Sequence, residues 1–222
     1  MVDSHALPDQ QAFAKELRTP TAAAVAGLVF SGILIAVLVL LHTSVPTGQA
    51  VPGWVNDPGR RRAVRIATSL IPFAGISFLW FIGVIRTRIG AREDKLFATV
   101  FLGSGLLFVG LLFTSSAFLG TVLVLFDQGM GVGAESMVSL QVLTRELMGT
   151  FGTRMAAVFT ISVSSVGMRT RVLPRWLVVV GFMAGLALLL SPPLTRWAQL
   201  VFPAWVLLVS LQILSAGRGN RT

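Results

Sequence analysis

The longest apolar stretch of the sequence runs from Leu96 to Phe126 and contains thirty-one residues without an ionisable side chain. A helix of this length measures about 46 Å, which exceeds the roughly 30 Å hydrocarbon core of a bilayer. Charged residues close both ends, at 92–95 and at Asp127. The pattern therefore predicts a helix that crosses a membrane and either tilts or extends beyond it.

Five more apolar stretches predict further spanning helices. They cover residues 21–41, 66–85, 135–168, 174–190 and 194–214. The second helix begins before its apolar part, because Asp57 followed by Pro58 is typical of an N-cap and a first helical residue. Residues 44–59 are rich in Pro and Gly and predict an irregular loop, with Trp54 at the membrane interface. The expected fold class is an all-α, polytopic transmembrane helix bundle of six spans.

Small residues predict where two of these helices approach each other closely. Gly103, Gly110 and Ala117 recur every seven residues and form a smooth strip on the longest helix. We expect residues 96–126 and 135–168 to pair as a long antiparallel hairpin that extends past the outer membrane surface. The strip would then face Gly149, Thr153, Ala156 or Ala157 of the second helix.

The composition is that of a membrane protein. Hydrophobic residues make up 54% of the 222 residues and charged residues 12%, with a mean hydropathy of +0.80. A soluble domain of this composition would expose too much apolar surface. The net charge of +9 does not indicate nucleic acid, since the basic residues sit in short stretches between apolar runs, as topology signals do. The absence of cysteine excludes disulfides and thiolate chemistry.

The distribution of basic residues predicts the orientation. With six spans, eleven Lys and Arg residues lie on the side of the two termini and seven on the opposite side. The positive-inside rule therefore puts both termini in the cytoplasm. Residues 1–20 would form a cytoplasmic N-terminal segment, residues 21–214 the transmembrane domain, and residues 215–222 a basic cytoplasmic tail.

Residues 72–113 carry a resemblance to known proteins. They read PFAGISFLWFIGVIRTRIGAREDKLFATVFLGSGLLFVGLLF, which resembles a family of uncharacterised bacterial integral membrane proteins. The resemblance implies a six-helix protein of the plasma (inner) membrane and supplies no known activity. A weaker similarity, to the loop motif between helices 2 and 3 of major facilitator transporters, rests on Gly83, Arg88, Gly90, Arg92 and Leu96. Thr87 stands where that motif carries an aspartate, and six spans are half of such a transporter.

A search for catalytic or metal-binding constellations finds none. The two histidines are His5, in the polar N-terminal segment, and His42, at the end of the first span. They do not have the spacing of metal ligands, and none of the nine acidic residues lies near the centre of a predicted span. The sequence therefore predicts no catalytic residue, no cofactor and no metal.

One candidate site rests on depth in the membrane. Counting along the helices puts Arg154 roughly 8 Å, Pro72 about 9 Å and Pro203 about 10 Å below the outer surface. Each proline leaves a carbonyl without its helical partner. These groups predict an outward-facing polar pocket floored by Arg154, an anion or lipid-headgroup site formed by Arg154, Glu146, Ser115, Ser116, Thr68, Pro72, Gln199 and Pro203. Alternatively, Arg154 snorkels to the surface, pairs with Glu146 and only anchors its helix.

A second group of charges, the outer basic cluster, opens the second helix with Arg60, Arg61, Arg62 and Arg65. It has two interpretations. The cluster could hold anionic lipid headgroups at the outer surface. Alternatively, Asp127, Glu135 and Glu146 on neighbouring helices neutralise it.

These features favour a non-enzymatic integral membrane protein that binds lipid, including anionic lipid, or another membrane protein. The alternative is a small oligomeric transporter or channel for an anionic or amphiphilic solute, with Arg154 and the proline-interrupted helices lining the route. A membrane enzyme comes third, because the groups that such chemistry needs are missing. The expected partners are the bilayer and a second copy or another membrane protein, and not nucleic acid.

Overall fold

The computed structural model describes residues 20–45, 52–89, 95–129, 134–170, 173–191 and 196–219. The regular elements that these residues form are all helices, so the predicted all-α fold is confirmed. They are α2 (Pro20–Ser44), α3 (Pro52–Val55), α4 (Pro58–Ile89), α5 (Lys95–Asp127), α6 (Ala134–Glu146), the π-helix η2 (Leu147–Gly152), α7 (Thr153–Thr170), α8 (Arg175–Leu190), the 3-10 helix η3 (Arg196–Leu200) and α9 (Val201–Gly219). Residues 1–19 and most of the loop motif at 90–94 lie outside the described part of the chain.

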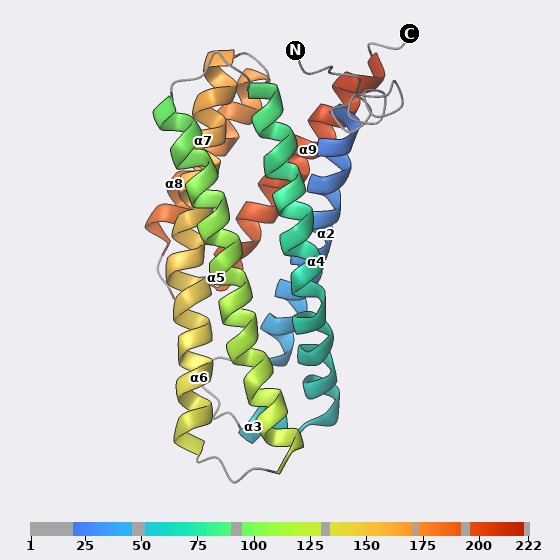
Figure 1. The fold of residues 1–222 in the computed structure, drawn as a ribbon, viewed down its shortest axis with the longest axis vertical. Coiled ribbons are helices and arrows are strands. Elements are labelled where there is room, and N and C mark those ends of the chain that lie inside the picture. Colours follow the sequence, from blue (N-terminus) through green and yellow to red (C-terminus); the bar gives the residue numbers. More distant parts are fainter. Residues whose placement is uncertain are drawn as a thin grey trace, which may run out of the picture.

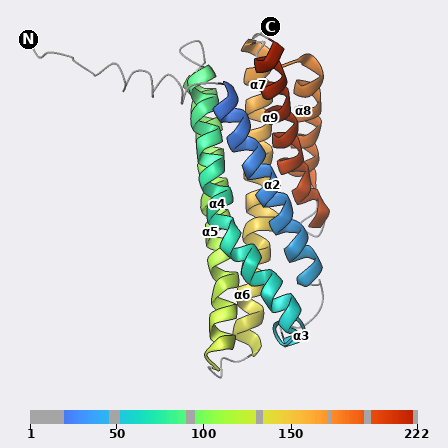
Figure 2. The same ribbon diagram turned by 90° about the vertical axis from the view of Figure 1, so that its right-hand side faces the viewer.

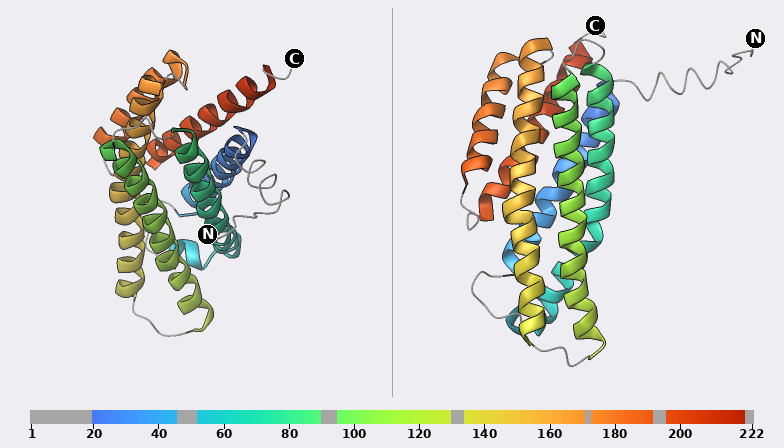
Figure 3. Two further views of the ribbon diagram at one scale, coloured as in Figure 1. Left: turned by 45° about the horizontal axis from the view of Figure 1, so that its top comes forward. Right: turned by 60° about the vertical axis from the view of Figure 1, so that its left-hand side comes forward.

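The long helices run side by side along one axis (Figure 1). α2 begins and α9 ends at one end of this bundle, while α3, the end of α5 and the start of α6 lie at the other, which we call the α3 end (Figure 2). α2, α8 and α9 stop short of the α3 end, so α4, α5 and α6 extend beyond them (Figures 2 and 3). α6, η2 and α7 follow one another without a gap as a single rod beside α5.

Four of these helices are long and apolar enough to cross a membrane: Ala22–Ser44, Pro58–Arg86, Ala98–Asp127 and Trp197–Ala216. α8 is also apolar but has only 16 residues. The described residues therefore form an all-helical structure with four helices that are compatible with a membrane protein. The two further spans expected from the sequence, through α6–η2–α7 and through α8, do not follow from helix length and composition alone.

The start of α4 is capped as the sequence predicts. Asp57 Oδ1 accepts hydrogen bonds from the backbone N–H groups of Gly59, at 2.8 Å, and Arg60, at 3.2 Å. These bonds satisfy two of the amides that a helix N-terminus leaves without partners. α4 then continues through Pro72, and Figure 2 shows the helix changing direction along its length.

Phenylalanine rings from five helices meet in the middle of the bundle. The ring centroid of Phe78 on α4 lies 4.5 Å from Phe30 on α2 and 5.0 Å from Phe159 on α7. It lies 5.5 Å from Phe108 on α5 and 5.6 Å from Phe202 on α9. All five side chains are buried, and we call them the aromatic cluster. Because each ring comes from a different helix, the cluster fixes all five relative to one another.

The glycine strip predicted on α5 is not where helices meet. Gly110 is exposed, and a Cβ atom added to Gly103 or Gly110 would have no atom within 4 Å. The close approach is at Gly105 instead, where a Cβ atom would lie 2.6 Å from Ile82 Cδ1. The expected pairing of the strip with the second helix is therefore wrong. Consecutive helical residues point about 100° apart, so α5 buries a neighbouring face.

A second apolar core lies at the α3 end. Trp54 and Val55 of α3 are buried against Val64 of α4 and three residues of α5; we call this group the Trp54 cluster, and its members are Trp54, Val55, Val64, Leu119, Val122 and Leu123. The Arg61 guanidinium donates to the Val55 carbonyl at 2.9 Å and so caps α3. The segment expected to be irregular thus contains the four-residue helix α3, while residues 46–51 of it lie outside the described part of the chain. The Trp54 indole, expected at the membrane interface, is fully enclosed by protein.

Candidate functional site

A cavity of about 130 Å³ lies between the two cores. Its walls come from α2, α4, α5, α6, the start of η2 and η3. Leu34 and Leu112 on its wall belong to the same core as the aromatic cluster, whereas Leu119 belongs to the Trp54 cluster. The cavity is therefore the space where the two cores fail to meet.

The cavity wall combines apolar and polar side chains. Its apolar lining consists of Leu34, Val37, Leu38, Leu41, Val45, Ile71, Leu112, Leu119 and Met148. Its polar lining consists of His42, Ser115, Ser116, Gln141, Thr144, Arg145 and Gln199, and we call these residues the polar belt. No Asp or Glu lies among the lining residues.

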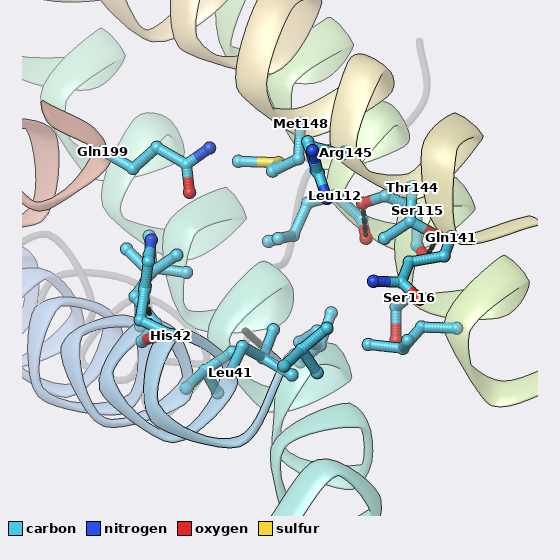
Figure 4. A pocket seen from close by; sticks show the side chains of 16 residues that line it. Leu41, His42, Leu112, Ser115, Ser116, Gln141, Thr144, Arg145, Met148 and Gln199 are labelled. Atoms are coloured by element: carbon cyan, nitrogen blue, oxygen red, sulfur yellow. Dashed lines mark hydrogen bonds between the residues drawn. The ribbon is translucent and has the colours of Figure 1, made fainter. Parts of the chain in front are cut away.

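Helical spacing explains how the sequence places these side chains together. Leu34, Leu38 and His42 recur every four residues and so share one face of α2. On the rod opposite, Gln141 and Arg145 are also four residues apart and share a face of α6. Figure 4 shows the Gln199, His42 and Arg145 side chains directed toward one open space.

Several groups of the polar belt already have partners on the helix backbone. The Ser115 hydroxyl donates to the Leu112 carbonyl at 3.1 Å, and the Thr144 hydroxyl donates to the Leu140 carbonyl at 2.9 Å. His42 Nδ1 donates to the Leu38 carbonyl, and the imidazole stacks on Trp197 with ring centroids 5.2 Å apart. A nitrogen donor turned toward this carbonyl fixes the orientation of the ring. Arg145, which is exposed on one side, adds the positive charge.

Gln141 joins the cavity to the Trp54 cluster. Its side-chain Oε1 accepts a hydrogen bond from Trp54 Nε1 at 3.3 Å, and both residues are buried. The bond spans 87 positions of sequence and fixes α3 to α6. A polar pair at this depth is satisfied without water.

Arg154 and Glu146 do not line this cavity. The Arg154 guanidinium donates to the Thr150 carbonyl at 2.9 Å, and the Thr150 hydroxyl donates to a Glu146 carboxylate oxygen at 2.9 Å. The cavity is therefore not the expected pocket floored by Arg154. The arginine that lines it is Arg145, nine residues earlier on the same rod.

The other predicted site residues divide into two groups. Ser115, Ser116 and Gln199 line the cavity as expected. Thr68, Pro72 and Pro203 do not: the Thr68 hydroxyl donates to the Val64 carbonyl at 3.0 Å, Pro72 is exposed, and Pro203 is buried within α9. Sequence reasoning missed His42, Gln141, Thr144 and Arg145. The sequence signal that could have identified His42 is its four-residue spacing from Leu38 and Leu34, which puts all three on one helix face.

The outer basic cluster is mostly engaged within the protein. Arg65 pairs with Asp127 at 2.7 Å, and Arg60 lies 3.5 Å from Asp57. Arg61 stacks over the Phe126 ring at 4.8 Å besides capping α3. The predicted neutralisation by Asp127 is thus confirmed, whereas Glu135 and Glu146 form no ion pair within the described residues. Arg62 is exposed, and the described residues offer it no carboxylate.

The described residues contain no group of three His, Asp or Glu side chains that could hold a metal ion. The arrangement combines a positive charge and hydrogen-bond donors with an apolar space. No protein-family model, curated protein or solved structure matches the chain. The fold and the cavity thus define a class, an all-helical bundle with helices long and apolar enough to span a membrane and a cavity between them.

Proposed function

We propose that the protein binds a membrane amphiphile, with the acidic headgroup of the ligand in the polar belt. The observation that carries this proposal is the composition of the cavity wall, where Arg145 and amide donors face an apolar floor and no carboxylate competes with an anion. A guanidinium binds phosphate and carboxylate oxygens strongly, because its donors match their geometry.

The apolar part of the cavity wall supports an amphiphile over a simple anion. Nine apolar side chains, Leu34 and Met148 among them, border the same space as the polar belt. They form an apolar floor for the chain of a lipid whose headgroup lies in the polar belt. An apolar cavity of roughly 150 Å³ holds one benzene-sized group. A cavity of about 130 Å³ therefore accommodates one part of a ligand, whose remainder lies outside it.

We further propose that the chain crosses the plasma (inner) membrane of a bacterium six times, with both termini cytoplasmic and the α3 end outside. Support comes from the eleven to seven distribution of basic residues and from the rod α6–η2–α7, which packs along α5. In this arrangement α5 and the rod form a hairpin that extends past the outer surface. The family resemblance of residues 72–113 is in keeping with it.

Single cysteines test the topology, because the chain has none of its own. The variants Gln128→Cys, Arg175→Cys and Ser215→Cys each place one thiol at an exposed position. With six spans, a membrane-impermeant maleimide added to intact cells labels the Gln128→Cys variant alone. With four spans, formed by α2, α4, α5 and α9, it also labels the Arg175→Cys variant. Labelling at position 175 would therefore contradict the six-span arrangement.

Titration with dodecyl phosphate tests the binding function. The protein, purified in dodecyl maltoside, is expected to bind dodecyl phosphate saturably in calorimetry and to carry acidic lipid in native mass spectrometry. Leu38→Trp should fill the cavity and abolish both signals. Arg145→Gln should weaken binding by roughly tenfold, in keeping with about 1.5 to 3 kcal/mol for a hydrogen bond to a charged group.

Arg154→Gln is the matched control, since it removes the same charge from the same rod at a residue that does not line the cavity. It should bind dodecyl phosphate as the unmodified protein does. Inorganic phosphate serves as a second control, because it resembles the headgroup of dodecyl phosphate and lacks the alkyl chain. If the ligand needs the apolar floor, dodecyl phosphate binds far more tightly than inorganic phosphate. Equal binding by the unmodified protein and Leu38→Trp would refute the proposal.

The position of the aromatic cluster makes transport the second candidate function, after binding. Its five rings fill the middle of the bundle on the side of the cavity away from α3. A transported solute would have to pass them, and this requires separation of helices that the rings hold together. Binding needs no such movement.

A further inference from the structure

The hydrogen bond between Trp54 and Gln141 fixes which end of the Gln141 amide faces the cavity. The indole N–H can only donate, so its partner at 3.3 Å must be the amide oxygen. The amide NH₂ group must then point the other way. Figure 4 shows the Gln141 nitrogen directed toward the open space that His42, Gln199 and Arg145 surround.

Burial stabilises this orientation of the Gln141 amide. Trp54 is 0% exposed and Gln141 7% exposed, so water does not compete for the bond. A flipped amide would leave the indole N–H without a partner in a buried site, which costs free energy. The Trp54 ring is held in turn by the Trp54 cluster, and α3 is capped by Arg61.

Gln141 and Arg145 therefore act on the same part of a ligand. They stand four residues apart on one face of α6, so their side chains are neighbours. One brings a fixed pair of amide N–H bonds, and the other brings a guanidinium. An oxyanion with two or more acceptor oxygens satisfies both, whereas a quaternary ammonium satisfies neither.

We propose that Gln141 determines the headgroup selectivity of the cavity, and that Trp54 is the positioning residue that holds the Gln141 amide with its NH₂ toward the ligand. The ligand class is an amphiphile with a phosphate-monoester or carboxylate headgroup. This inference rests on the proposed binding function. Without the indole N–H, the amide can turn its oxygen toward the headgroup and repel it.

The test compares two probes with the same chain, dodecyl phosphate and dodecyltrimethylammonium, in protein purified in dodecyl maltoside. The unmodified protein should prefer dodecyl phosphate. Gln141→Glu keeps an oxygen for Trp54 but turns the donor into an anion, so it should lower this preference at least tenfold or reverse it. Trp54→Phe keeps an aromatic ring without the N–H and should lower the preference about threefold, chiefly through weaker dodecyl phosphate binding.

Trp80→Phe is the control for the tryptophan change, because Trp80 is exposed on α4 and does not line the cavity. Melting temperatures separate selectivity from folding, since a purely structural Trp54 would change stability without changing the ratio of the two affinities. If Trp54→Phe does not fold, the affinity ratio of the Gln141→Glu variant alone decides whether Gln141 determines headgroup selectivity.

The outcomes distinguish this inference from the function on which it rests. If Arg145→Gln weakens dodecyl phosphate binding while Gln141→Glu and Trp54→Phe leave the ratio unchanged, the selectivity role is refuted and the binding function stands. If the unmodified protein and Leu38→Trp bind dodecyl phosphate equally, both proposals fall. A lowered ratio in both Gln141→Glu and Trp54→Phe, at an unchanged ratio in Trp80→Phe, supports the inference.

Discussion

The aromatic cluster and the Trp54 cluster are held together by different chemistry. The aromatic cluster consists of rings without a polar atom, drawn from five helices. The Trp54 cluster comes from three helices. Polar side chains stabilise this end of the bundle: Trp54 binds Gln141, Arg61 binds the Val55 carbonyl, and Arg65 binds Asp127. The cavity lies between them.

The difference follows from the surroundings of each core. In the middle of the bundle the helices satisfy most backbone groups internally, so ring packing can join them. At the α3 end the chain turns through a four-residue helix whose carbonyls need partners from outside it. The Arg61 guanidinium binds one of these carbonyls, and the Gln141 side chain accepts from the Trp54 indole N–H. The cavity beside this end therefore borders on a side chain whose orientation is fixed by a hydrogen bond.

If ring packing holds the bundle together, removal of its central ring should be the most damaging change. Phe78→Ala removes a fully buried side chain that contacts the four other rings of the aromatic cluster and Phe81, and we expect a loss of about 4 kcal/mol. Thermal unfolding in detergent measures it. Phe73→Ala, on the exposed face of the same helix, should leave the melting temperature nearly unchanged. Equal losses of stability in the two variants would show that the aromatic cluster does not hold the bundle together.

Disruption of the Trp54 cluster should unfold the α3 end locally and leave the rest of the bundle folded. Trp54→Ala leaves a cavity under α3 and should cost about 3 kcal/mol of local stability. Hydrogen exchange should then rise in residues 53–66 and 117–127 and stay unchanged around Phe78. Faster exchange around Phe78 as well would mean that the two cores unfold as one unit.

Substitutions of two glycines on α5 compare a packed face of this helix with an open one. Gly105→Leu places a side chain against Ile82 and Phe159 and should destabilise the protein by about 2 kcal/mol. Gly110→Leu meets open space and should be tolerated. Melting temperatures of the two variants give the comparison directly. A larger loss at Gly110 would indicate that this face packs against something, such as a second copy.

The ion pair at the α3 end should have the smallest effect. Arg65 and Asp127 are 2.7 Å apart, but both are about half exposed, so Arg65→Ala should cost no more than about 0.5 kcal/mol. The effect should vanish at high salt, because exposed charges are screened. Chemical denaturation at low and high salt measures it. A loss of several kcal/mol that persists in salt would instead make this pair a main support of the Trp54 cluster.

The helices of the bundle were accessible from the sequence because long apolar runs and charged boundaries define them locally. The stretch from Leu96 to Phe126 became α5 within one residue at each end, and Asp57 capped α4 as predicted. The glycine strip failed, because a spacing of seven shows that residues share a face and not which face is buried. α3 was missed because four residues are too few for a periodic pattern.

The candidate site was predicted only in part, and the error has a physical cause. Depth counting brought Ser115, Ser116 and Gln199 to one level, and these residues line the cavity. The same count chose Arg154 and passed over Arg145, because depth along a helix does not say which side chains face a shared space. The π-helix at Leu147–Gly152, which lies between the two arginines, was also not predicted.

That π-helix also sets the rotational phase between the two halves of its rod. It holds one more residue per turn than an α-helix, and Thr153 reaches back to the Met148 carbonyl across it. If the same residues took α-helical pitch, the extra residue would rotate α6 by about 100° relative to α7. Gln141 and Arg145 would then leave the cavity while α7 kept its contacts. Deletion of one residue within 147–152 together with that change of pitch would restore their orientation. The cavity-facing surface of α6 therefore depends on the pitch of this turn and on the number of residues in it.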